Sequence, residues 1–240
     1  NGFYDHFSNE ILDDVRVKTN FLTDHFGAKE SALGLASNLS KNNIHLGKDG
    51  GGMEVDFGLG LSAEVQNTNF DLLNKNGAAF VLLKAEPSVS FTLGNSHLKL
   101  GTVFNYINNT QSDRYGENTA NGKSKFYPKA ELQVGVLEQF NFYAGVDGGT
   151  QLNSYASLLA ENPYLVSDQV IKPTETKYSI YLGVKGDVNE NLKYNISGTY
   201  AKVNDAVFYV HNDLFDYDNT LNRSAYNYAN VLSTVYASGT

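Results

Sequence analysis

The sequence predicts an all-β fold, an antiparallel transmembrane β-barrel of which about ten strands are present, with short periplasmic turns and long extracellular loops. Three observations predict it. Apolar and polar residues alternate over unusually long stretches, no apolar run is long enough for a membrane-spanning helix, and the connections between strands alternate between long and short.

The longest alternation covers residues 53–65. Its odd positions, from Met53 to Val65, are apolar, and its even positions, from Glu54 to Glu64, are acidic or small. Successive side chains of a strand point to opposite faces, so one face is apolar and the other is polar. About 13 residues at roughly 3.3 Å each give about 43 Å, which a tilt near 45° projects to about 30 Å, the thickness of a bilayer core.

The same alternation recurs along the chain and predicts nine further strands. They cover residues 15–21, 33–40, 79–93, 97–106, 126–136, 140–147, 177–187, 192–200 and about 229–238. Pro87 cannot donate a backbone hydrogen bond, so we expect a β-bulge there. Residues 154–160 are expected to form a short helix before Asn162 and Pro163, and residues 206–210 an extended piece.

The expected connections fall into two length classes. Residues 94–96, 138–139 and 189–191 are tight turns, whereas residues 66–77, 107–125, 148–176 and 204–228 are long and polar. Every second connection of an up-and-down barrel lies on the same side of the membrane, and outer-membrane barrels have short turns on one side and long loops on the other. Residues 41–52 are too long for the short turn expected there.

Composition excludes several classes of protein. The 240 residues include no cysteine, so no disulfide or thiolate metal site is available, and the net charge of −8 argues against a nucleic-acid partner. The chain opens at Asn1 without a signal segment and ends at Thr240, and we expect it to be a piece of a longer protein, all of it (1–240) part of one barrel domain.

The polar faces of the predicted strands carry mixed charge. One interpretation is a charged lumen that guides solutes, and the other is a solvated face with cross-strand ion pairs. The charged residues are Glu54, Asp56, Glu64, Lys84, Glu86, Lys99, Lys129, Glu131, Lys177, Lys185, Asp187 and Lys193.

Aromatic residues gather near the ends of the predicted strands. They indicate girdles at the two membrane interfaces, with the aromatic core of a sandwich as the alternative. The residues are Phe91, Phe104, Tyr106, Phe126, Phe140, Phe142, Tyr178, Tyr194 and Tyr200.

No catalytic, cofactor-binding or metal site is predicted, and we expect the protein not to be an enzyme. The five histidines (His6, His25, His45, His97 and His211) are scattered, and no nucleophile motif is present. Asp213, Asp216, Asp218 and Asn219 lack the spacing of a calcium loop and predict an acidic solvated loop.

Three stretches resemble the barrel part of TonB-dependent-receptor-like outer-membrane proteins. They are residues 140–149 (F-N-F-Y-A-G-V-D-G-G), Glu161-Asn162-Pro163 and residues 178–186 (Y-S-I-Y-L-G-V-K-G). The resemblance extends from about Leu33 to the end and implies a bacterial outer-membrane barrel. Such receptors carry a plug domain and an energy-coupling box, neither of which is identified here.

Three functions are therefore considered. The first is a transporter or channel for solutes across the outer membrane, with the long loops at its outer mouth. The second is a non-transporting scaffold that binds partner proteins of the envelope, and the third is a soluble secreted β-sandwich or adhesin. The expected partners are the lipid bilayer and, for the scaffold, envelope proteins, and the solute is unknown.

Overall fold

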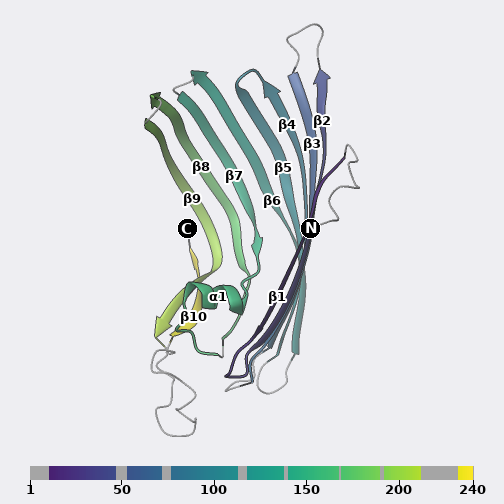
Figure 1. Ribbon diagram of the computed structural model, residues 1–240, viewed down its shortest axis with the longest axis vertical. Helices are drawn as coiled ribbons and strands as arrows, with labels where there is room; N and C mark the ends of the chain where they lie inside the picture. The colour runs from purple at the N-terminus through teal and green to yellow at the C-terminus, as the bar shows by residue number, and fades with distance from the viewer. Residues whose placement is uncertain are drawn as a thin grey trace.

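The computed structural model describes residues 11–46, 53–71, 77–112, 118–137, 140–167, 169–189, 192–211 and 232–239. These residues form ten strands and one short helix (Figure 1). The elements are β1 (Leu12–Thr23), β2 (Lys29–Leu46), β3 (Met53–Asn69), β4 (Gly77–Leu93), β5 (Ser96–Ser112), β6 (Asn118–Leu137), β7 (Phe140–Gln151), α1 (Tyr155–Glu161), β8 (Thr174–Asn189), β9 (Leu192–His211) and β10 (Leu232–Gly239). Among the described residues no helix is long and apolar enough to cross a membrane.

All ten strands belong to one antiparallel sheet in which each strand pairs with its neighbours in chain order. Within the described part of the chain, β2 is the only strand that pairs with β1 and β9 the only strand that pairs with β10, although Leu232 of β10 also forms an isolated parallel bridge with Leu165. The sheet curls, so that β1 and β10 lie on opposite sides of α1 at its lower end (Figure 1). A single sheet is not a pair of stacked sheets, so the β-sandwich alternative is wrong.

The strands are longer than the sequence pattern suggests. Residues 107–125, expected to be a loop, lie mostly in β5 and β6, which pair continuously from Ser96 to Ser112 and from Val134 to Asn118. β2 likewise extends to Leu46 and β3 to Asn69. These strand ends are polar on both faces and carry no alternation, so their sequence resembles that of a loop.

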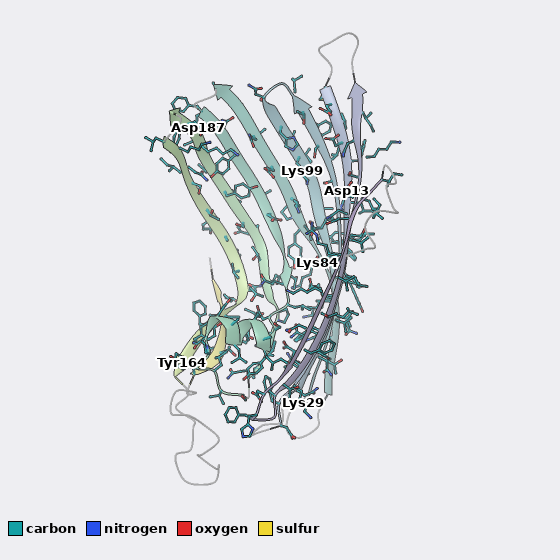
Figure 2. All side chains as sticks on the ribbon, viewed as in Figure 1. Asp13, Lys29, Lys84, Lys99, Tyr164 and Asp187 are labelled. Atoms are coloured by element: carbon teal, nitrogen blue, oxygen red, sulfur yellow. The ribbon has the colours of Figure 1, made fainter. Side chains whose placement is uncertain are left out.

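The sorting of connections by length is confirmed only in part, because the connections at residues 70–76 and 113–117, where long loops were predicted, are about as short as residues 47–52 at the opposite end of the sheet. Residues 94–95, 138–139 and 190–191 connect strands at one end of the sheet, which we call the short-turn end. Residues 152–173 and 212–231 connect strands at the opposite end, the long-loop end. Figure 2 places Asp187 and Lys99 toward the short-turn end, and Lys29 and Tyr164 at the end that holds α1.

The predicted bulge at Pro87 is wrong. β4 keeps one register with β5 on both sides of this residue, from Lys84 paired with Asn105 to Ser88 paired with Gly101. A real register shift lies between Asp147 and Gly149 in β7, where the pattern predicted a strand end. The acidic loop expected at residues 213–219 and His6 lie outside the described residues.

The two faces of the sheet differ as the alternation predicts. The face turned away from α1, which we call the outer face, exposes large apolar side chains, among them Phe126 (71%), Ile196 (68%) and Leu182 (65%). The other face, here called the inner face, carries the polar residues and contacts α1 through Glu30. Because these apolar side chains are exposed among the described residues, their burial requires another apolar medium.

The outer-face aromatics form two groups separated by aliphatic residues. Toward the long-loop end, Phe104 packs on Phe126 with ring centroids 4.8 Å apart, and Tyr178 lies 6.3 Å from Tyr200. Toward the short-turn end, Phe140 lies 6.3 Å from Tyr194. From Phe126 to Val136, the apolar outer face of β6 spans about 25 Å at a tilt near 45°, the height of the apolar band of outer-membrane barrels.

Two tyrosines of the inner face cover glycines on the neighbouring strand. Tyr143 is paired with Gly183, and Tyr181 with Gly145. A Cβ added at Gly183 would lie 2.5 Å from the Tyr143 ring and 2.8 Å from the Ile196 carbonyl oxygen. The Tyr143 hydroxyl donates to Asn195 Oδ1 at 2.6 Å, so the ring is held over the glycine.

We therefore predict that Gly183→Ala destabilises the sheet by about 1–3 kcal/mol, since the added methyl group overpacks against both ring and backbone. Gly198→Ala is the control, because a Cβ there would meet nothing within 4 Å. Urea unfolding in detergent micelles measures both, and equal midpoints for the two variants would contradict the packing argument.

Candidate functional site: the inner face and the segment that crosses it

The connection between β7 and β8, residues 152–173, folds back over the inner face and is here called the inner segment. It is described except at position 168. Its helix α1 begins with a capping box: Ser154 Oγ accepts a hydrogen bond from Ser157 N–H at 3.0 Å, and the Ser154 N–H donates to Ser157 Oγ at 3.1 Å. This local pattern sets the start of the helix that the sequence predicts.

A buried carboxylate from β2 holds the first turn of α1. Glu30, which is 4% exposed, accepts the Tyr155 N–H at 2.6 Å and the Ala156 N–H at 3.2 Å. The Thr68 hydroxyl of β3 donates to the same carboxylate at 2.8 Å. Glu30 thus satisfies backbone donors that no intrahelical carbonyl can reach.

A second carboxylate, Asp24, lies in the connection between β1 and β2 and holds the other side of the inner segment. Its Oδ1 accepts the Phe26 and Ala28 N–H groups at 2.9 and 2.7 Å, and its Oδ2 accepts the Ser167 hydroxyl. The Tyr155 hydroxyl lies 3.0 Å from Ser167 Oγ. Burial raises the pKa of the Tyr155 hydroxyl to about 12, and the neighbouring Asp24 carboxylate acts in the same direction.

Apolar packing accompanies these hydrogen bonds. Tyr155 and Ile171 of the inner segment lie in one buried cluster with Phe70, which follows β3, and with Ala78, Phe80, Leu82 and Ile107 of the sheet. The ring of Tyr155 meets Phe70 edge to face with centroids 5.0 Å apart. Gln66 Nε2 donates to the Asn153 carbonyl at 3.0 Å, and Gln111 Nε2 to the Ile171 carbonyl at 3.2 Å.

The inner segment also binds the opposite edge of the sheet. The Val166 N–H donates to the Leu232 carbonyl of β10 at 3.0 Å, and the Gln169 side-chain oxygen accepts the Thr234 N–H at 2.8 Å. The Tyr209 hydroxyl of β9 donates to Glu161 at 2.6 Å. The segment therefore spans the concave side from β2 to β10.

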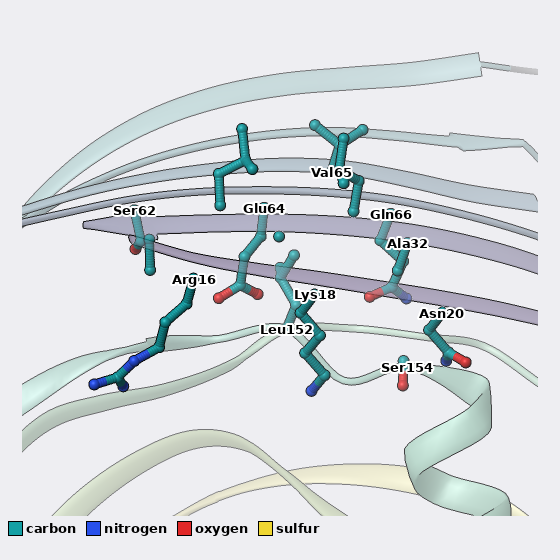
Figure 3. Close-up of a pocket in the computed structure, with 14 residues that line it drawn as sticks. Arg16, Lys18, Asn20, Ala32, Ser62, Glu64, Val65, Gln66, Leu152 and Ser154 are labelled. Carbon is teal, nitrogen blue, oxygen red and sulfur yellow. The ribbon is translucent and has the colours of Figure 1, made fainter. Parts of the chain in front are cut away.

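Two cavities lie along the inner face beside this segment, the first lined by both apolar and charged side chains and the second mainly by polar ones. The first has a volume of about 300 Å³ and is bounded by β1, β2, β3 and the inner segment (Figure 3). The second, of about 580 Å³, extends across β1 to β6 and is lined by Asp56, Glu86, Lys99 and Lys129, among others. Arg16 lines both cavities, so they adjoin.

The structure brings some of the predicted charged residues together and leaves others apart. Lys129 pairs with Glu86 at 2.6 Å in the second cavity, and Glu64 lines the first. Asp187 and Lys193 form an exposed pair at 3.3 Å near the short-turn end. Glu54, Lys84, Glu131, Lys177 and Lys185 line neither cavity.

Sequence reasoning missed the residues that hold the inner segment. Residues 78–83 (A-A-F-V-L-L) do not alternate, which signals a strand buried on both faces, and Phe80 and Leu82 are buried under Tyr155 and its neighbours. Asp24, Glu30 and Thr68 carry no comparable signal, because polar residues also occupy the solvated parts of the same face. Within the described residues, no group of three or more His, Asp or Glu side chains could hold a metal ion.

No protein-family model and no curated protein sequence matches this chain. Its fold is similar to that of the alcaligin outer-membrane receptor FauA of Bordetella pertussis, with a TM-score of 0.51 and 15% sequence identity. The fold is that of an outer-membrane β-barrel. The match covers 94% of this chain and 37% of the receptor, so the chain spans little more than a third of that protein's length.

In a barrel of this fold the two faces of the sheet have different surroundings. The outer face, with its two aromatic groups, corresponds to the lipid-facing side of such barrels, and the inner face to the lumen. The inner segment then lies in the lumen near the end with the long loops, and the two cavities lie beside it along the lumenal wall.

We predict that Glu30→Ala loosens the inner segment, because it leaves two helix N–H groups and the Thr68 hydroxyl without an acceptor. The free energy of local opening should fall by about 2–4 kcal/mol. Hydrogen exchange at the Tyr155 and Ala156 amides measures this effect directly.

The matched control is Glu64→Ala, which removes a carboxylate from the same face on β3. Glu64 has no hydrogen-bond or ion-pair partner in the described part of the chain, so exchange in α1 should be unchanged. Equal protection of α1 in wild type and Glu30→Ala would overturn the role assigned to Glu30.

Proposed function

We propose that the protein is a barrel of the bacterial outer membrane that lets a polar solute pass along its lumen. The observation that carries this proposal is the pair of adjoining cavities, both with charged side chains in their lining, on the inner face of a sheet whose outer face is apolar. A channel needs a polar wall inside and an apolar surface toward lipid, and the charged inner face and the apolar outer face of this sheet support the proposal.

The two cavities follow the wall from the inner segment toward the short-turn end. In outer-membrane barrels long loops face the outside of the cell and short turns face the periplasm. With that orientation the inner segment lies at the outer mouth, and a solute entering there reaches the first cavity and then the second.

The inner segment narrows this route. Its buried contacts on β2 and on β10 keep it across the concave side instead of in external solvent. We infer that it acts as a constriction whose position depends on Glu30 and Asp24. Energy-coupled import of the TonB-dependent kind is a narrower proposal, supported by the resemblance of residues 140–149 and 178–186 to such receptors.

A scaffold within an envelope complex is the second candidate. The well-packed inner segment favours it, because a segment bonded on both sides of the lumen could occlude transport altogether. Under either function we keep the prediction that the protein is not an enzyme.

Conductance in planar bilayers separates the two candidates. We expect the purified protein to give discrete ionic current steps, and Glu30→Ala to give larger steps, because a loosened constriction widens the mouth. Glu64→Ala should not enlarge them to the same extent, since Glu64 does not hold the inner segment. Silence from wild type and Glu30→Ala alike, with a partner protein that co-purifies in stoichiometric amount, would instead support the scaffold.

The lipid-facing assignment has its own test. Leu182→Arg places a charge at the middle of the outer face and should destabilise the folded protein in lipid vesicles by about 2–4 kcal/mol. Thr199→Arg, on the inner face of β9, should change stability by less than about 1 kcal/mol because its side chain stays in water. Urea titration in vesicles measures both, and equal losses would refute the assignment of the two faces.

A further inference from the structure

We propose that the first cavity binds a small dipolar solute, one that carries an ammonium and a carboxylate group on the same molecule, as a free amino acid does. Lys18 of β1 would bind the carboxylate, and Glu64 of β3 the ammonium group. The inference rests on the proposed function, for which it names the class of solute.

The register of β1, β2 and β3 brings the lining residues of the first cavity together. Lys18, Gly34 and Glu64 lie in one row across β1, β2 and β3, since Lys18 pairs with Gly34 and Gly34 with Glu64. The neighbouring rows repeat the pattern, with Ala36 between Arg16 and Ser62 and Ala32 between Asn20 and Gln66. Small residues on the central strand, with the longer Arg16 and Lys18 on β1 and Glu64 and Gln66 on β3, make a trough.

The two charges that face this trough have no protein partner. Within the described residues neither Lys18 nor Glu64 makes an ion pair or a hydrogen bond. Their backbones are two strand spacings apart, about 10 Å. Figure 3 shows both side chains extending into the cavity, with Ser154 of the inner segment at its far wall.

The balance of charge favours a dipolar solute over a simple anion. Arg16, the other cation of the cavity, already lies 2.5 Å from Asp14, so among the described residues that line the cavity Lys18 is left as the unpaired cation and Glu64 as the unpaired carboxylate. An anion bound at Lys18 would lie near the Glu64 carboxylate and be repelled by it, whereas an ammonium group on the same molecule turns that repulsion into attraction. The volume of about 300 Å³ is at the lower end for ligand pockets and suits a small solute.

Isothermal titration calorimetry of the detergent-solubilised protein at low ionic strength tests the proposal, with alanine as the probe and acetate and methylammonium as singly charged controls. We expect alanine to bind at least about tenfold more tightly than either control, since each charged hydrogen bond contributes about one factor of ten or more. Low salt is required because screening weakens exposed charges.

Lys18→Gln and Glu64→Gln should each weaken alanine binding by about tenfold or more. The double variant K18E/E64K should recover most of the affinity, because a dipolar solute can bind in the reverse orientation. Lys193→Gln is the matched control, since Lys193 pairs with Asp187 outside the cavity and its loss should leave binding unchanged.

Two results would overturn the proposal without any variant: no heat from alanine, or acetate binding as tightly as alanine, which would indicate a simple anion site. Unaltered alanine binding in both single variants would overturn the assignment to Lys18 and Glu64. If the protein conducts ions in bilayers but fails these binding tests, the proposed function stands and this inference alone is overturned. If the protein binds alanine but conducts no ions, the binding site stands and the proposed function is overturned.

Discussion

The structure depends on the direction in which the apolar side of a single sheet points. Leu182, Ile196 and Phe126 project away from the inner face, against which α1 and its neighbours pack. In the described part of the chain, the apolar cluster on the inner face centres on Tyr155 and Phe80, and the few buried residues outside it, such as Val103 and Tyr127, leave too little apolar packing to account for ten strands. The hydrophobic stabilisation of the sheet must therefore come from the medium around it, and an outer-membrane bilayer supplies such a medium without leaving strand backbones unpaired.

The sequence predicts correctly those parts of the fold that depend on a local pattern of residues. Alternation over residues 53–65 correctly predicts the two faces of β3, and the tight turn at residues 94–95 follows from local sequence. The pattern fails at the ends of β5 and β6 that lead to Ser112 and Asn118. Both faces of the sheet are polar there, so the amino-acid composition of these strand ends is that of a loop. The bulge expected at Pro87 fails for another reason: the register on both sides of it is fixed by the rest of β4.

The contacts of the inner segment could not be predicted from local sequence. Glu30 and the Tyr155 N–H that it accepts lie 125 positions apart, and a glutamate on a polar strand face gives no sign of whether water or a helix will cover it. The charged residues singled out from the sequence were chosen by face alone, so they include Glu64 and Lys129 of the cavities together with exposed residues such as Lys193. Lys18 and Arg16 were in the predicted strand at residues 15–21, but only the register across β1, β2 and β3 gives them a common cavity with Glu64.

Small residues on the inner face determine which charges meet. Lys129 pairs in register with Gly101 of β5 and reaches past it to Glu86 of β4, so that this ion pair bridges two strand spacings. Gly34 stands between Lys18 and Glu64 in the same way, yet those two charges stay apart. A glycine between two charged residues thus allows an ion pair to form in one stretch of the lumenal wall. In another stretch, a positive and a negative charge stay separated on either side of such a glycine. A neutralised stretch gives little electrostatic discrimination between solutes, whereas a separated pair favours a solute whose own charges match it in sign and spacing. Under the proposed function, selectivity between solutes would lie at the row of Gly34, next to the inner segment.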